Sequence, residues 1–410
     1  MPETNQDSQV PNLWWERTDL GYLEGQLWFE GIEVRNLVDC NGTPLYVYNR
    51  NRAADNISRL SRAMSAAHPR TCIFYAMKSN RYEPLLKWMA SLGSLGIDAC
   101  SPGEVELALQ CGFRDEQISY TATGMSYREW ELVLRHPGIV VNADSFGDIR
   151  KIAEIAPGRT IGIRVNPGIS LGYRQNPKLM YTQQSRFSKF GVSMEECEQA
   201  IAFAETSGLQ VCGIHAHVGC GYLAEQLPQY ERLLDRLVEL ISRFPKVESL
   251  NLGGGFGIPL VEEDGHWDLE QWAALLHSRF RGWEGQLCCE PGDYLVKDAG
   301  LLLAEVTNIE TKCGRKVIWV NAGFNIHPEP VFYSLPLYPV PLVQRPGETE
   351  TVTIVGNINE VHDIWMEDIR MLPVKEGDVI AFLNAGGYGA AMSSNHCCRG
   401  TFREMLIPTE

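Results

Sequence analysis

The chain has 410 residues, 44% of them hydrophobic and 21% charged, so it can bury a sizeable core in one large or two ordinary domains. Its formal net charge of −15 argues against nucleic acid or an anionic membrane as a main partner, because both bind through basic surfaces. The N-terminal segment is polar and acidic, and no apolar run reaches the ~18 residues that span a bilayer. We therefore predict a cytoplasmic protein.

The cysteines are scattered and form no CxxC pair. Of the 12 in the chain, the only clusters are the adjacent pairs Cys288-Cys289 and Cys397-Cys398. In a large chain of this kind such spacing is typical of reduced, mostly buried thiols rather than of disulfides or a metal centre. We predict no metal site.

Short apolar runs rich in β-branched residues alternate with segments of helical period. The runs begin at Cys72, Leu95, Ile118, Ile139, Thr160, Val211, Ser249 and Gln286. The helical segments include YERLLDRLVELISRF from Tyr230 and DLEQWAALLHSRF from Asp268, each with its apolar residues on one face. Eight such strands predict an α/β fold, a parallel sheet closed as a (β/α)8 TIM-like barrel, with a doubly wound open sheet as the alternative.

The pattern changes after about residue 300. The segments LLLAEVTNIE, KVIWVNAG, VTIVGNI, DVIAFLNAG and EMLIPTE are typical of strands joined by Gly and Pro turns. GQLWFEGIEV near the N-terminus has the same character. We predict a barrel domain over residues 42–300 and a β-sandwich or β-barrel domain formed by residues 1–41 and 301–410.

Polar and small residues follow the predicted strands. In a barrel the working face lies at the carboxyl ends of the strands, so these residues should border one cavity. They are Lys78, Asp98, Thr123-Gly124, Asp144-Ser145, Arg164, Asn166, His217, Gly253 to Gly255 and Glu290.

The chemistry of these residues fits one coenzyme. The run LGGGFG can turn backbone N–H groups toward a phosphate, although a glycine triplet is often only a tight turn. His217 offers a flat ring, Glu290 a carboxylate, and Lys78 an amine that forms a Schiff base with an aldehyde unless it is merely a surface lysine. A phosphate, a ring nitrogen, a ring face and an aldehyde are what pyridoxal 5'-phosphate presents.

Six motifs occur in the order of a known family. They are FYAMKSN, GIDACSPGEVELAL, HAHVGCG, LGGGFG, CEPGD and AGGYG. In these the chain resembles the fold-type III, pyridoxal-phosphate-dependent amino-acid decarboxylases, a group that contains diaminopimelate decarboxylase and eukaryotic-type ornithine decarboxylase. The resemblance extends from GTPLYVYNR at Gly42 almost to the C-terminus. It implies an alanine-racemase-like barrel and a homodimer in which GNINEVHD crosses into the partner's active site.

The resemblance also implies roles for matching residues. Lys78 would hold the coenzyme as a Schiff base, His217 would stack on its ring, and Glu290 would pair with the pyridine nitrogen. The remaining cofactor residues would be the phosphate ligands Gly253, Gly254, Gly255 and Tyr388, and the supporting residues Asp98 and Arg164. For the last two the alternative is a structural ion pair at the barrel rim.

Three departures from the family concern the substrate. Asp293 stands where the family has the arginine of EPGR, and Glu329 stands where a second arginine precedes a proline. Without these cations a remote carboxylate has no bidentate anchor, which makes diaminopimelate a doubtful substrate. Asn359 replaces the cysteine associated with protonating the carbanion, so another acid must act; the candidates are Lys78, His362 and Cys397.

The charge changes suggest a substrate class. We predict that a cationic side chain, as in ornithine or lysine of either chirality, or a specialised-metabolite precursor, is bound by Asn325, Glu329, Asn359, Glu360 and Asp363, some of which could instead be solvated turn residues. Decarboxylation is the leading interpretation, because a carboxylate at Glu290 maintains a stronger electron sink than the arginine of alanine racemase. The alternatives are a racemase or epimerase of the same fold, favoured by the lost cysteine, and a pyridoxal-phosphate-binding protein without turnover.

Overall fold

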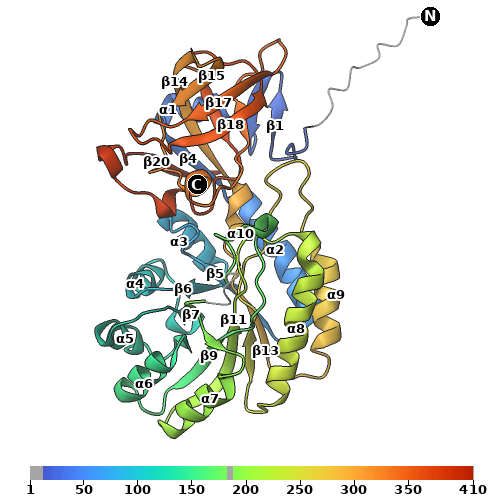
Figure 1. Cartoon of the computed structure of the whole chain (residues 1–410), viewed down its shortest axis with the longest axis vertical. Helices are drawn as coiled ribbons and strands as arrows, with labels where there is room; N and C mark the ends of the chain where they lie inside the picture. Colours follow the sequence, from blue (N-terminus) through green and yellow to red (C-terminus); the bar gives the residue numbers. More distant parts are fainter. Residues whose placement is uncertain (1–12, 182–187, 410) are drawn as a thin grey trace, which may run out of the picture.

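This computed structural model describes residues 13–181 and 188–409, and Figure 1 shows them as one elongated molecule. A parallel barrel with helices around it occupies the lower part of the view. A mixed β structure, built from segments near both ends of the chain, occupies the upper part. Across the described ranges, no helix combines the length and apolar character needed to cross a membrane.

The barrel is a closed ring of eight parallel strands, and each predicted apolar run contributes one of them. In chain order they are β5 (Thr71–Ala76), β6 (Gly96–Ala99), β7 (Ile118–Thr121), β8 (Val140–Ala143), β9 (Thr160–Asn166), β11 (Gln210–Ala216), β12 (Ser249–Asn251) and β13 (Gln286–Cys289). Pairing of β13 with β5 and of β8 with β9 closes the ring, and the short β10 (Val192–Ser193) adds to β9. The predicted (β/α)8 barrel is confirmed.

Helices cover the outside of the barrel. They are α2 (Arg50–Ala67), α3 (Glu83–Ser91), α4 (Pro102–Gln110), α5 (Tyr127–Leu134), α6 (Phe146–Ile155), α7 (Cys197–Thr206), α8 (Leu227–Ser242) and α9 (Leu269–Arg279). The predicted apolar face of α8 is buried, including Leu233, Leu234 and Leu237. Asp268 caps α9 by accepting hydrogen bonds from the backbone N–H groups of Glu270 and Gln271, which satisfies two of its free donors.

The second part is an eight-stranded mixed sheet. Its strands are β4 (Leu45–Asn49), β14 (Gly300–Lys312), β15 (Arg315–Val320), β16 (Pro339–Pro341), β17 (Glu350–Val355), β18 (Ile364–Met371), β19 (Val379–Phe382) and β20 (Arg403–Ile407). The long strand β14 connects the sheet, because it pairs with β4, β15 and β19. Apolar clusters containing Tyr46, Leu302 and Phe382, and Leu45, Leu301 and Leu303, give the sheet two packed faces.

The N-terminal segment packs on this sheet but does not join it. β1 (Leu20–Leu23), β2 (Gln26–Phe29) and β3 (Ile32–Glu33) form a separate three-stranded sheet, followed by α1 (Val34–Asn41). Trp15, Leu27 and Phe29 share an apolar cluster with strands of the larger sheet. One difference concerns the predicted range 42–300: it includes β4, which hydrogen-bonds to β14 and β20 and not to the barrel.

Candidate active site

Lys78 lies just beyond β5, at the carboxyl end of the barrel. Its Nζ donates a hydrogen bond of 2.5 Å to Oδ2 of Asp98 on the neighbouring strand β6. Burial would lower the pKa of Lys78, but Asp98 raises it above its usual value. The amine is therefore held as an ammonium group beside a buried carboxylate, and it must transfer a proton before it can attack an aldehyde.

Glu290 follows β13 directly and is held by three buried side chains. One carboxylate oxygen accepts hydrogen bonds from Ser119 (2.9 Å) and Asn251 (2.7 Å), and the other lies 2.7 Å from Nε2 of His215. Burial would raise the pKa of Glu290, but His215 and the hydrogen bond from Ser119 help to lower it to about 2. Glu290 is thus a fixed carboxylate at physiological pH.

His217 presents a neutral ring at the same end of the barrel. Burial lowers its pKa well below the ordinary value, and the nearby cations Arg164 and Lys78 lower it further. The ring of Tyr181 meets it at an interplanar angle of 61°, with the ring centroids 4.4 Å apart. A half-buried neutral imidazole next to Lys78 and Glu290 can serve as a flat packing surface.

The glycine run after β12 has a shape that other residues cannot adopt. A Cβ atom on Gly254 would lie 1.9 Å from the carbonyl oxygen of Glu290, and one on Gly255 would lie 2.0 Å from that of Gly219. The φ angles of Gly253 (+68°) and Gly255 (+98°) also favour glycine. Within residues 13–181 and 188–409, the backbone N–H groups of Gly254, Gly255 and Gly387 have no acceptor. The adjacent free donors of Gly254 and Gly255, called the cradle below, are suited to bind an anion.

The cradle and the titratable residues enclose one small cavity. Tyr388, half-buried and with a positive φ of 53°, lies on its wall, and its N–H donates to the carbonyl of Ser79. The wall is formed by Ala76, Lys78, Asp98, His217, Cys220, Gly221, Gly254, Gly255, Phe256, Glu290, Gly292, Asp293 and Tyr388. An amine, a ring face, a carboxylate and free N–H groups therefore surround the same space, and this donor set fits pyridoxal phosphate.

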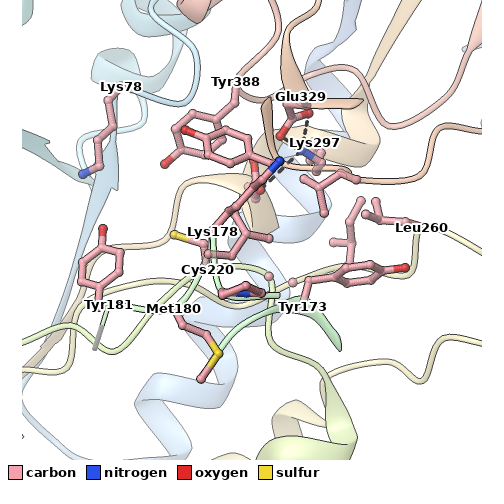
Figure 2. Close-up of a pocket in the computed structure, with 18 of the residues that line it drawn as sticks. Lys78, Tyr173, Lys178, Met180, Tyr181, Cys220, Leu260, Lys297, Glu329 and Tyr388 are labelled. Carbon is pink, nitrogen blue, oxygen red and sulfur yellow. Dashed lines mark hydrogen bonds and ion pairs between the residues drawn. The ribbon is translucent and has the colours of Figure 1, made fainter. Parts of the chain in front are cut away.

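A larger cavity of about 560 Å³ opens beside this one. Figure 2 shows Lys78 and Tyr181 on one side of it and Lys297 and Glu329 on the other, with Tyr388 between them. The two cavities share Lys78, Cys220, Gly221, Asp293 and Tyr388 on their walls. A molecule in the larger cavity would therefore have access to the amine of Lys78.

The side of this cavity away from Lys78 carries a buried ion cluster. Lys297, just after α10 (Asp293–Val296), donates to both carboxylate oxygens of Glu329 in α11 (Glu329–Phe332), at 2.6 and 2.7 Å. Its Nζ also lies 3.5 Å from Oδ2 of Asp293. Burial would lower the pKa of Lys297, but Asp293 and Glu329 raise it, so it remains a cation between two carboxylates.

Comparison with known proteins decides the family. The family model described as "Pyridoxal-dependent decarboxylase, pyridoxal binding domain" matches residues 54–297. The chain belongs to the pyridoxal-dependent decarboxylase family. This confirms the resemblance found in the sequence, the coenzyme pyridoxal phosphate and, at the level of the family, an amino-acid decarboxylase.

The relatives cover nearly the whole chain. The diaminopimelate decarboxylase of Methanothermobacter thermautotrophicus is 33% identical over 94% of this chain and 91% of its own length. Among solved structures, diaminopimelate decarboxylase from M. jannaschii in complex with L-lysine is 25% identical, with a TM-score of 0.85, and covers 95% of this chain and 92% of its own. The Helicobacter pylori enzyme with L-lysine is also 25% identical, with a TM-score of 0.83 and coverages of 92% and 95%.

The structure brings most predicted cofactor residues of the decarboxylase together. The small cavity is lined by Lys78, Asp98, His217, Gly254, Gly255, Glu290 and Tyr388. Gly253, the third glycine predicted to bind the phosphate, does not line it, and its N–H donates to Oδ1 of Asn251 at 2.9 Å. Arg164 does not line it: its guanidinium donates to Asp144 at 2.8 Å and lies over the ring of Phe190. Asp98 and Arg164 therefore each have an ion partner, but they do not pair with one another.

The predicted substrate residues are less closely grouped. Of the five, only Glu329 lines the larger cavity of the single chain. Asp363 is buried and accepts hydrogen bonds from the N–H groups of Phe324 and Ile358, and the amide of Asn325 donates to the carbonyls of Ser394 and Arg399. Asn359 and Glu360 are exposed, and Glu360 lies 3.3 Å from His396. The substrate-binding role of these four stays a prediction that requires a second chain.

Sequence reasoning missed the residues that hold the reactive groups. His215, Ser119 and Asn251 lie within strands rather than after them, so the strand-end rule did not select them. Alternation along the strand could have found His215, because it lies two residues before His217. The sequence did not single out Lys297, because its partner Glu329 is remote in sequence and lies outside the barrel.

Proposed function

We propose that this decarboxylase removes CO2 from an amino acid whose side chain ends in a cation, such as ornithine or lysine of either chirality, and not from diaminopimelate. The observation that carries the proposal is the ion cluster across the cavity from Lys78. There, the carboxylates of buried Glu329 and half-buried Asp293 have a single cation between them, Lys297.

The charge of this cluster disfavours a second carboxylate on the substrate. Lys297 already donates to Glu329 twice and lies near Asp293, so a substrate carboxylate at this cluster would face two carboxylates whose cation is already engaged. The other lysines on the cavity wall have contacts of their own, since Lys178 donates to Oγ of Ser334 and Lys189 lies over the ring of Phe190. A cationic end group would instead balance the excess negative charge of the cluster. The cluster therefore supports a basic amino acid and argues against diaminopimelate.

The remaining site residues support decarboxylation over racemisation. When bound, the coenzyme supplies an electron-accepting ring that takes up the electron pair left behind as CO2 departs. Glu290, with its pKa near 2, would hold a proton at the ring nitrogen and so maintain the positive charge that draws electrons in. Neutral His217 would pack against the ring, and Lys78 would exchange its bond to the coenzyme for the amine of the substrate.

Two properties of the relatives bear on the proposal in opposite directions. The curated relatives are named diaminopimelate decarboxylases, and that activity is the principal competitor. Two of the solved relatives are in complex with L-lysine, which supports the binding of a basic side chain in a cavity of this fold, although lysine is also what diaminopimelate becomes when it loses CO2.

We also propose a homodimer with shared active sites. Val361, in the GNINEVHD segment, is 89% exposed, and Phe332 and Ile364 are also exposed. Large apolar side chains gathered on one surface are typical of an interface. A second chain would bring Asn359 and Glu360 toward the partner's cavity, where the sequence predicts them to act.

Release of CO2 from a panel of L- and D-amino acids, with pyridoxal phosphate supplied, tests the proposed substrate. The panel contains ornithine, lysine, arginine, glutamate and diaminopimelate. We expect the highest kcat/KM for one basic monocarboxylic amino acid. A higher value for diaminopimelate would refute the substrate proposal. If no CO2 is released but the substrate loses its optical rotation, the racemase alternative is favoured.

A further inference from the structure

Asp293 is an acidic residue on the wall of the cavity where the coenzyme phosphate would bind. Its side chain lines the small cavity together with Gly254, Gly255 and Tyr388. Its Oδ1 atom is buried and has no hydrogen-bond partner in the described part of the chain. That oxygen lies against Gly387, because a Cβ atom on this glycine would come within 2.4 Å of it. Gly387 is itself one of the residues with a free backbone N–H group.

The cavity wall lacks a counter-charge for a phosphate. Apart from Lys78, which is held by Asp98, no lysine or arginine lines the small cavity within the described ranges. Lys297 is nearby but donates to Glu329. A phosphate dianion next to the free oxygen of an ionised Asp293 would face strong repulsion without a cation between them. A proton between the two oxygens removes this repulsion and satisfies the unpartnered atom.

We propose that Asp293 binds the coenzyme phosphate through a shared proton, so that binding of the phosphate takes up one proton from solution. The proton lies between Oδ1 of Asp293 and a phosphate oxygen, and no other bond forms or breaks in this step. The inference rests on the coenzyme and not on the proposed substrate, so it stands or fails independently of which amino acid is decarboxylated.

The groups around Asp293 are suited to this role. Burial raises the pKa of Asp293, and Lys297 opposes that shift only in part. Burial also raises the pKa of Cys220, to about 11, and those of the facing tyrosines. The groups that therefore stay neutral near pH 8 are Cys220, Tyr75, Tyr333 and Tyr388. Lys297 stays charged because its pKa is raised, which leaves Glu329 as the other group nearby that could titrate.

Calorimetry with a coenzyme analogue tests the shared proton directly. Pyridoxine 5'-phosphate carries the phosphate but has no aldehyde, so it cannot react with Lys78. The full-length chain, freed of coenzyme, is titrated with it at pH 8 in buffers of different ionisation enthalpy. At this pH the free phosphate is a dianion, since its second pKa is about 6. We expect uptake of about one proton and an affinity that falls about tenfold for each pH unit above 8.

Matched variants and a matched ligand identify the group. In Asp293→Asn the amide supplies an N–H donor without needing a proton from solution. This variant should therefore bind pyridoxine 5'-phosphate without proton uptake, and more tightly than the wild type at pH 9. Glu329→Gln should take up as many protons as the wild type when it binds pyridoxine 5'-phosphate. Pyridoxine, which lacks the phosphate, should bind to the wild type without proton uptake. The proposal is overturned if the wild type takes up no proton, if Asp293→Asn takes up as many as the wild type, or if the phosphate adds nothing to the affinity of pyridoxine.

Discussion

Replacing Glu329 with glutamine should change which substrate the enzyme prefers. The substitution removes one negative charge from the ion cluster and leaves Lys297 and Asp293 as a balanced pair. A unit charge about 5 Å from the end group of a substrate, at an effective dielectric constant of about 20, is worth ~3 kcal/mol. That energy corresponds to about two orders of magnitude in kcat/KM. We therefore expect kcat/KM for the preferred basic amino acid to fall about 100-fold and the value for diaminopimelate to rise.

The assay is CO2 release from both substrates, compared as a ratio of kcat/KM values. Glu270→Gln, the same change at an exposed position in the first turn of α9, is the matched control and should leave the ratio unchanged. Retained coenzyme absorbance and melting temperature in Glu329→Gln would show that the fold accommodates the substitution. If the ratio stays within a factor of about three of the wild type, the electrostatic argument for substrate choice is wrong.

Other predictions follow from the same contacts. Lys78→Ala should abolish the borohydride-reducible bond to the coenzyme; a variant that kept it would show that another amine is used. Lys297→Met leaves buried Glu329 and half-buried Asp293 without their cation and should lower the free energy of unfolding by about 3–5 kcal/mol in urea titrations. Adding Glu329→Gln should restore part of this stability, and an unchanged midpoint in Lys297→Met would contradict a structural role. Glu360→Gln should raise KM for a basic substrate, and unchanged kinetics would remove Glu360 from the site. Activity on a basic substrate should also depend on pH in a definite direction. Burial raises the pKa of Glu329 above its ordinary value of 4.5, and Asp293 contributes to this shift. As the pH falls toward that raised pKa, Glu329 gains a proton and stops attracting the cationic end group. We expect KM for the basic substrate to rise below neutral pH, and the rise should be absent in Glu329→Gln. A KM that is flat over this range in the wild type would argue against an ionised Glu329.

The reactive groups could be read from the sequence because they obey a local rule. Lys78 and Glu290 each follow an apolar run, and parallel strands deliver such residues to one edge of the barrel. The shape of LGGGFG was readable for a similar reason, since few other sequences permit its backbone angles.

The groups that set the charge of the site could not be predicted in this way. The pairing of Lys297 with Glu329 depends on how the β domain packs against the barrel, and no periodicity encodes that arrangement. The sequence drew attention to Asp293 and Glu329 as positions where the resemblance implies arginines, but it did not reveal that Lys297 lies between them. Arg164 was expected at the coenzyme, whereas its pairing with Asp144 appears only once strands β8 and β9 are placed side by side.

The position of β4 has a consequence for how the protein is made. This strand, Leu45–Asn49, is synthesised before the barrel, yet its neighbours in the sheet are β14, which begins at Gly300, and β20, which ends at Ile407. As the chain leaves the ribosome, both edges of β4 stay unpaired until β14 emerges, and the edge that pairs with β20 stays open until Arg403–Ile407 have also been made. The barrel can close before β20 is made, whereas the sheet of the β domain can be completed only after it. Truncation before Arg403 should therefore leave one edge of β4 open to aggregation.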